Sequence, residues 1–292
     1  MPRTGTLRSP ATTVSSTAIP ASADPARLRH PLEKRVEAIV TAVDAILVTA
    51  IAGFLFWGTE WLETRPSLAQ YEPHAQVLLA LLLGAPIIAT FIRRRRRLLA
   101  QEDSIRISES QLPDVHAVLV KHCRRIGIPV PELFISDTVE HTTSFGWRQH
   151  RCIILSTHDF SMAPEAFDDI VDFVLAREVG SICLGYTSYR NELLASWVAP
   201  IPFLRHPLNR LRTFSRDRYG ALLAPRSFRA LIAAACSDRL RERVGLATYL
   251  SQLDEETDFR GVTNSLVWLL KKRVPLGHRI RELQRAGMLP ES

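Results

Sequence analysis

A glutamate and a serine, Glu178 and Ser181, stand three residues apart in the apolar stretch FVLAREVGSICLGY, residues 173–186. A glutamate in such a place can act as a general base if a nearby group activates water. Ser181 would need a histidine base to become a nucleophile, and no histidine lies near it in the sequence. His206 and His278 stay open as bases that the fold could bring close to it.

The histidines and cysteines form no metal-binding pattern. The nine histidines are scattered, and no pair of candidate ligands has the i, i+4 helical spacing that suits zinc. The nearest alternatives are Cys152 with His158, His141 with His150, and Cys183. The cysteines have no CxxC pair, which favours buried free thiols in a reducing compartment over a disulfide framework. They are Cys123, Cys152, Cys183 and Cys236.

Two apolar runs, IVTAVDAILVTAIAGFLFWG and AQVLLALLLGAPIIATFI, precede these residues. The first has the length of about 20 residues that spans a bilayer core. Its one charge, Asp44, would face the partner helix or another protein. The second carries Pro86, which a membrane helix tolerates as a kink. A pair of buried helices in a soluble core is the alternative. We expect a transmembrane hairpin over residues 31–98, with helices at about 37–58 and 75–92.

Positive charges flank the two runs and set their orientation. Arg27, Arg29, Lys34 and Arg35 come before the first run, and five arginines, Arg93–Arg97, follow the second. Positively charged flanks of membrane helices stay in the cytoplasm, so both termini are expected there. The protein itself is expected in the cytoplasmic membrane, with its hairpin in contact with the lipid bilayer. The chain has a formal net charge of +7, but the arginine cluster lacks interleaved aromatic residues, which argues against nucleic acid as a partner.

Residues 1–30 are rich in Ser, Thr, Ala and Pro and are expected to be disordered. The helices and strands that must position Glu178 belong to a cytosolic domain, which is expected over residues 99–292. The order is helix, small sheet, then several helices, so we predict an α+β fold. Helices are expected at 113–128, 164–186, 215–235, 240–253 and 277–288. Strands are expected at 131–138 and, as a hairpin, at 145–157.

Five phrases in this order resemble the HtpX-like membrane zinc metallopeptidases of the gluzincin type, relatives of the CAAX prenyl proteases. They are CRRIGIPVPELFIS (123–136), TTSFGWRQHRCIILS (142–156), VLAREVGSICLGY (174–186), TFSRDRYGA (213–221) and KRVPLGHRIREL (272–283). The resemblance implies a transmembrane hairpin followed by a mainly helical, zincin-like cytosolic metallopeptidase domain with a small β-sheet.

The family's zinc is held by two histidines of an HExxH helix and a glutamate from a later helix. In this chain those ligand positions are Arg177, Ser181 and Thr213, none of which suits zinc. Glu178 stands in the general-base position and Asp217 in the position that supports a ligand. The resemblance therefore implies a zinc-protease helix without its zinc, an idle Glu178 and no cofactor.

A vacated metal site leaves carboxylates buried without a cation, which costs free energy. We therefore predict an ion pair of Arg177 with Asp217 or with Glu178; the alternative is that Arg177 is a surface residue. In the family, substrates align along a strand edge near the zinc helix. The residues of this chain in that neighbourhood are Thr143, Ser144, Phe145, Gly146 and Trp147.

The leading functional hypothesis is a membrane-anchored pseudopeptidase that binds a polypeptide or membrane-protein partner as a scaffold or regulator. One alternative is an active membrane peptidase or other hydrolase with a non-standard metal site. A third is a domain kept only for its fold and its anchor. A groove with charged lining would favour binding, and a collapsed groove filled with apolar side chains would favour a structural role.

Overall fold

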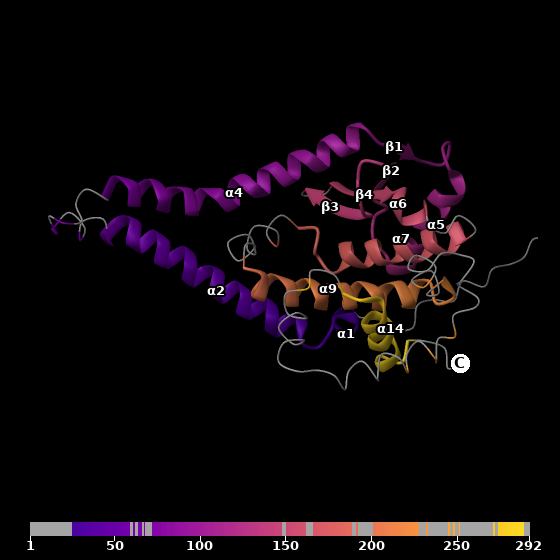
Figure 1. Cartoon of the computed structure of the whole chain (residues 1–292). Helices are drawn as coiled ribbons and strands as arrows, with labels where there is room; N and C mark the ends of the chain where they lie inside the picture. The colour runs from indigo at the N-terminus through magenta and orange to yellow at the C-terminus, as the bar shows by residue number, and fades with distance from the viewer. Residues whose placement is uncertain are drawn as a thin grey trace, which may run out of the picture.

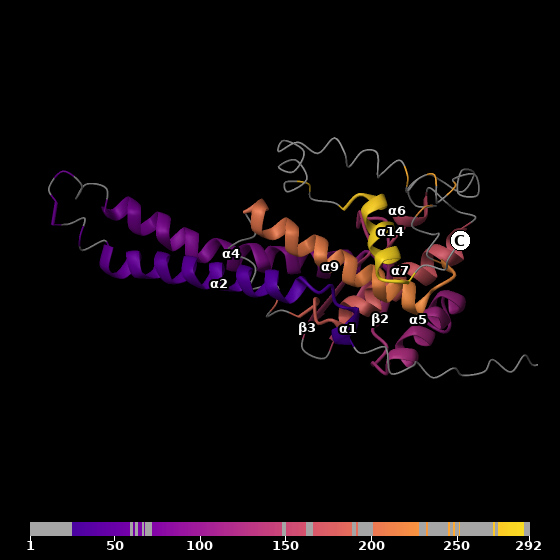
Figure 2. The ribbon, with the colours of Figure 1, turned by 90° about the horizontal axis from the view of Figure 1, so that it is seen from below.

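The computed structural model describes residues 25–58, 61, 64–65, 67, 72–147, 150–161, 166–188, 191, 201–227, 232, 245, 248, 251, 271 and 274–288. These residues form a mostly helical α+β fold with one four-stranded sheet, as the sequence predicts. Two long helices, α2 and α4, lie side by side and extend away from the rest of the fold (Figures 1 and 2). Most of the expected helix at 240–253 and most of the expected disordered segment lie outside the described residues.

Helix α2, Glu33–Gly53, continues through a π-helical turn, η2, to Gly58. This continuous stretch is long and apolar enough to cross a membrane, and only 11% of its most apolar window is buried inside the protein. Ile46, in its middle, is 68% exposed. A core helix of a soluble domain would bury such a face, so α2 is the one straight candidate span among the described residues.

Helix α4, Glu72–Glu102, contains the second apolar run but is bent. Its two parts, which end at Gly84 and begin at Pro86, are bent by 41° relative to each other. They are long and apolar enough to cross a membrane only if they are counted together as one span. Proline removes a helical hydrogen bond and explains a bend at this place. The helix also ends ten residues later than the predicted 92, because its last turns pack on the sheet through Ala100.

The base of α2 is built into the domain through Glu33, which is completely buried. The Tyr186 hydroxyl donates a 2.5 Å hydrogen bond to Oε1 of Glu33, and the Ser215 hydroxyl donates to Oε2. Leu28, on the short helix α1 (Pro25–Leu28), joins the core. Residues 25–30, part of the segment 1–30 that was expected to be disordered, thus belong to the fold, and α2 is continuous with the domain.

The sheet has the order β1-β2-β4-β3, with β2 parallel to β4 and the other pairs antiparallel. Its strands are β1 (Ile105–Ile107), β2 (Glu132–Ser136), β3 (Thr143–Trp147) and β4 (His150–Ser156). The strand at 131–138 and the hairpin at 145–157 are confirmed with slightly different bounds, whereas β1 was not predicted. Since three residues carry little periodicity, β1 is recognised only by its pairing with β2.

Helices cover one face of the sheet in layers. Below the sheet in Figure 1 lie α5 (Pro113–Ile126) and α7 (Phe167–Cys183), then α9 (Pro202–Leu223), then α14 (Leu276–Arg285); α6 (His158–Ser161) follows β4. Alternate strand residues such as Leu133 and Ile153 enter the main core with α7. Their neighbours Phe134 and Ile154 form a second cluster on the opposite face with the end of α4. The sheet is therefore buried on both faces.

Helix α9 begins at Pro202, whereas the sequence predicted a helix from residue 215 to 235. The prediction was wrong about the start because PFLRHPLNRLR contains two prolines and many polar residues, a pattern typical of a loop. Leu208 nevertheless packs on Val40 of α2, and Pro202 suits the first helical turn. Packing against α2 therefore stabilises the first half of α9. The helix ends at Leu223.

A partly buried carboxylate, that of Asp172, joins α7 to α5. Oδ1 of Asp172 accepts hydrogen bonds from Lys121, at 2.9 Å, and from Nε2 of His122, at 3.0 Å. Burial alone would raise the pKa of Asp172, but these two hydrogen bonds and charges outweigh it and lower the pKa to about 2. The pair of helices is thereby held by a carboxylate that stays ionised.

This carboxylate makes the folded state sensitive to acid. The pKa of Asp172 is lower in the folded chain than in the unfolded chain, so its ionised form stabilises the folded state by about 2 kcal/mol. This stabilisation is complete above about pH 4 and is lost as the pH falls toward 2. We expect Asp172→Asn to lower the free energy of unfolding at pH 6 and the difference from wild type to shrink below pH 4. Denaturant unfolding in detergent across this range measures it; a difference that is independent of pH would contradict the assignment.

Candidate functional site

Helices α7 and α9 approach each other closely at two glycines. A Cβ atom on Gly180 of α7 would lie 2.4 Å from the Cβ of Tyr219, and one on Gly220 of α9 would lie 2.8 Å from Cγ of Arg177. Both distances are shorter than any ordinary contact, so only glycine allows this separation. The close crossing brings the 177–181 stretch of α7 against the 213–220 stretch of α9.

Asp217, fully buried on α9, holds two arginines. Arg279 of α14 donates two hydrogen bonds to it, from Nε to Oδ2 at 2.6 Å and from Nη2 to Oδ1 at 2.7 Å. Arg177 of α7 approaches with its Nε 2.8 Å from Oδ1. The Nε–H of Arg177 is not aligned for a hydrogen bond, so charge attraction rather than hydrogen bonding joins this pair. The three residues, named the ion triad below, link three helices.

The ion triad keeps its carboxylate ionised. Burial alone would raise the pKa of Asp217, but the charges of Arg279 and Arg177 outweigh it and lower the pKa. Burial lowers the pKa of Arg177, whereas the charge and hydrogen bonds of Asp217 raise that of Arg279. The charges of Arg279 and Arg216 also lower the pKa of Arg177, whereas hydrogen bonds to Asp217 help to raise that of Arg279. An arginine starts far above neutral pH, so both guanidinium groups stay charged.

Glu178, 3% exposed, lies on the side of α7 that faces the sheet. Its Oε2 accepts a 2.6 Å hydrogen bond from the hydroxyl of Ser144 in β3, and Nη1 of Arg216 lies 3.8 Å from its Oε1. The carboxylate in the general-base position is therefore engaged by a hydroxyl and a cation. Together with the ion triad, the cluster has three arginines and two carboxylates, a formal charge of +1.

The sequence-predicted residues come together only in part. The predicted ion pair of Arg177 with Asp217 is present, so Arg177 is not a free surface residue; the partner of Glu178 is Arg216 instead. Ser181 is buried, and among the described residues no histidine hydrogen-bonds to it. The hydroxyl of Thr213 donates to the carbonyl of Asn209 in its own helix at 2.9 Å.

Two arginines of the site had no predicted role. Arg279 lies within the predicted tail phrase KRVPLGHRIREL, and Arg216 lies within TFSRDRYGA. The available signal was charge: two carboxylates and one arginine at one buried site leave a formal charge of −1, which calls for further cations. Sequence spacing alone could not say which of the 37 Lys and Arg residues would supply them.

Strand β3 forms one edge of the sheet, beside this cluster. Its Ser144 points toward α7, and its neighbour Phe145 packs in the cluster on the opposite face, with the guanidinium of Arg97 6.0 Å from the ring centre. Within the described part of the chain, β4 is the only strand that pairs with β3, so no other described strand pairs with its outer edge. The side chain of Trp147 lies outside the described residues.

The alternative metal ligands do not converge. Nδ1 of His141 lies 3.6 Å from Asp159, and Nε2 of His158 is 3.1 Å from the carbonyl oxygen of Asp137. Among the residues that the structure places, no group of three or more histidine, cysteine, aspartate or glutamate side chains is arranged to hold a metal. Cys123, Cys152 and Cys183 are free thiols, and Cys236 lies outside the described residues.

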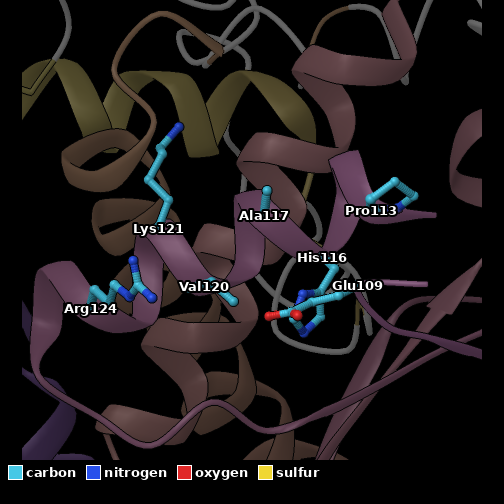
Figure 3. A pocket seen from close by; sticks show the side chains of 7 residues that line it. All are labelled: Glu109, Pro113, His116, Ala117, Val120, Lys121 and Arg124. Atoms are coloured by element: carbon cyan, nitrogen blue, oxygen red, sulfur yellow. The ribbon is translucent and has the colours of Figure 1, made fainter. Parts of the chain in front are cut away.

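A cavity of about 280 Å³ lies on the outer surface of α5, away from the ion triad. In Figure 3, Glu109 and His116 lie close together at one end, and Lys121 and Arg124 lie toward the other. Lys121 already pairs with Asp172. The cavity mixes both charges without a common direction, so it suggests no ligand.

Comparison of the chain with protein-family models, with curated proteins and with solved structures finds no match. The likeness to zinc metallopeptidases therefore stays a proposal, which rests on the sequence phrases and on the geometry above.

The close crossing of α7 and α9 leads to a prediction about Gly180. In Gly180→Ala the new methyl group would overlap Tyr219, so the helices must separate, and we expect a loss of about 1–3 kcal/mol in unfolding free energy. Gly84→Ala is the matched control, because a Cβ there meets nothing within 4 Å. Thermal unfolding of both variants measures the effect; a Gly180→Ala melting temperature equal to that of Gly84→Ala would contradict the crossing.

Proposed function

We propose that this protein is a membrane-anchored, catalytically inactive homologue of zinc metallopeptidases that binds a polypeptide along β3. One observation carries the proposal: the ion triad lies between α7 and α9 at the positions where the resembled family has its zinc site. A cation is present there, but it is a guanidinium supplied by the protein itself.

The residues do not fit a zinc ion. Arginine has no lone pair to offer, and the hydroxyls of Ser181 and Thr213 are poor ligands compared with imidazole or carboxylate. Glu178 is engaged by Ser144 and Arg216. Without a metal ion to lower the pKa of a water molecule, a glutamate alone is a weak general base for amide hydrolysis. Since Asp217 is saturated by two arginines, no carboxylate of the site remains to complete a ligand set.

The outer edge of β3, with which no other described strand pairs, is the surface that suits a polypeptide. An extended segment can add to a sheet edge through main-chain hydrogen bonds, with its side chains deciding specificity. Arg216 is 30% exposed beside this edge and gives the cluster its excess positive charge. The partner segment should therefore carry an acidic side chain that reaches Arg216. The side chains of Glu178 and Arg216 beside this edge are charged, which favours binding over a purely structural role.

The anchor is α2, with the bent α4 as a second span and both termini in the cytoplasm. Lys34 and Arg35 at the base of α2 are exposed, and the arginine run of α4 stands at the same end of the hairpin. The domain then lies on the cytoplasmic surface. Because α2 begins inside the domain at Glu33, β3 would keep a fixed orientation to the membrane.

A defined cross-linking experiment tests the binding edge. The full chain, purified in detergent with a photoreactive residue at Thr143, is irradiated with fluorescent acidic or basic peptides. The matched control carries the same photoreactive residue at Ile105, on the opposite edge of the sheet. We expect acidic peptides to be cross-linked at position 143 more than basic peptides, and the cross-linked peptides to have their full mass. In Arg216→Glu we expect basic peptides to be cross-linked more than acidic ones.

Equal labelling at 143 and 105, or labelling that does not respond to Arg216→Glu, would refute binding at β3. Cleaved peptides would overturn the inactive assignment and favour an active hydrolase with unusual ligands.

A further inference from the structure

Helix α9 runs antiparallel to the candidate membrane helix α2 and reaches well beyond its base (Figures 1 and 2). The contacts between the two helices follow one another in regular steps. They join Ser215 to Glu33, Arg212 to Glu37, and Leu208 to Val40. Farther along, Ile201 and Leu47 belong to the same apolar cluster as Leu208. The start of α9 therefore lies at the level of Leu47.

This level lies inside the apolar run of α2, which begins at Ile39. A helix rises about 1.5 Å per residue, so Leu47 stands about 12 Å beyond Ile39. The run from Ile39 to Gly58 matches a bilayer core of about 30 Å, whereas residues 48–58 alone would cover only about 16 Å. A span that began beyond α9 would thus be too short. Because α2 needs its whole apolar run to cross a membrane, the first turns of α9 must enter the bilayer with it.

The composition of α9 changes at the level where the membrane surface would be. Residues 201–208, IPFLRHPL, contain one residue of the Lys, Arg, Asp or Glu types, whereas residues 209–218, NRLRTFSRDR, contain four arginines. The change falls at Leu208, which packs on Val40, one residue after the start of the apolar run. Arginine is costly inside a bilayer but suits its cytoplasmic surface, so both helices place the boundary at the same level.

The exposed side chains of residues 201–208 suit this position. Phe203, near the deepest point, is 47% exposed although it is large and apolar. In water such exposure costs free energy, whereas in a bilayer the ring is surrounded by acyl chains. Arg205 is exposed about 6 Å beyond the level of Ile39, and an arginine so close to the surface can extend its guanidinium to the headgroups.

The backbone at the start of α9 also suits an apolar surrounding. The first amides of a helix have no partner within it, and an unpaired amide in lipid costs several kcal/mol. Pro202 has no N–H, and the carbonyl of Ile201 accepts hydrogen bonds from the amides of Leu204, at 3.2 Å, and Arg205, at 3.1 Å. These three positions therefore present no unpaired backbone donor to lipid.

We propose that residues 201–208, named the α9 tip below, insert into the cytoplasmic leaflet beside α2, with Phe203 in contact with acyl chains. The proposal rests on the membrane anchoring by α2 proposed above, but not on the inactive site. Since α9 also carries Asp217, insertion of the tip sets the depth and tilt of the ion triad relative to the membrane.

Lipid cross-linking of the full chain in phosphatidylcholine vesicles tests the contact. The photoreactive residue benzoylphenylalanine replaces Phe203 in the test variant. It replaces Phe56, 67% exposed in η2, in a reference for the span, and Leu112, 44% exposed just before α5, in the matched control. All three positions are exposed, so the bulky ring should leave the fold intact. We expect a mass increase of one lipid at positions 203 and 56 and none at 112.

Phospholipase C, applied after solubilisation in detergent, locates the cross-link within the lipid. The chain labelled at position 203 should keep diacylglycerol, because the ring contacts acyl chains. A chain that keeps only phosphocholine, an adduct at 56 without one at 203, or equal labelling at 203 and 112 would overturn insertion of the α9 tip and leave the anchor in place. Absence of an adduct at 56 would refute the anchoring itself, and the insertion with it.

Discussion

Asp217→Asn is expected to lower the free energy of unfolding by about 3–5 kcal/mol, because it leaves two guanidinium groups beside a neutral side chain in a buried place. Asparagine keeps the size and one acceptor oxygen, so packing is unchanged and the effect reports charge. For a domain of this size the melting temperature should fall by on the order of 10 °C. Thermal unfolding of the full chain in detergent measures the loss.

Asp137→Asn is the matched control, since Asp137 is an exposed aspartate and its change should be nearly neutral. A second variant isolates the cause. Combining Asp217→Asn with Arg177→Met removes one of the two stranded cations and should recover part of the lost stability. If the single variant Asp217→Asn had the same melting temperature as the Asp137→Asn control, the ion triad would not hold α7, α9 and α14 together.

The triple variant Arg177→His/Ser181→His/Thr213→Glu is expected to bind zinc. Positions 177 and 181 lie one turn apart on α7, so two histidines there can share one metal ion, and position 213 lies on the helix that packs against them. Asp217, released from Arg177, can then accept from the new histidine at 177 and fix its orientation. The expected change is from no zinc to about one zinc per chain.

Arg177→His/Ser181→Ala/Thr213→Glu is the control, because it lacks one ligand and should lose most of the gained affinity. Zinc content and thermal stability with and without chelator are the measurements, and stability should become chelator-sensitive only in the triple variant. A folded triple variant that holds no more zinc than this control would mean that α7 and α9 do not have the arrangement of a zinc peptidase.

The parts of the site that follow from local patterns could be predicted from the sequence. Helix α7 and the hairpin of β3 and β4 are recognisable from periodicity and turn residues, and the need to neutralise Asp217 predicts its pairing with Arg177. Arg279 could not be assigned in the same way. It lies 62 residues from Asp217, and only the docking of α14 brings the two together.

The first half of α9 shows the same limit. Its sequence is typical of a loop, and it is helical because Leu204 and Leu208 pack against α2, a contact between segments about 160 residues apart. The sequence offers no local signal for the role of Glu33, which the structure buries under Tyr186 and Ser215. Long-range packing decides such residues, and local sequence carries no signal for it.

The central claim is that a protein cation, Arg177, has taken the place of the metal. The most direct measurement is the zinc content of the wild-type full chain, expressed in zinc-supplemented medium, purified in detergent and dialysed mildly before elemental mass spectrometry. The account predicts zinc near zero in a folded sample. Near-stoichiometric zinc that is lost in Glu178→Gln or Asp217→Asn would contradict it and show that these carboxylates, not the arginines, define the site.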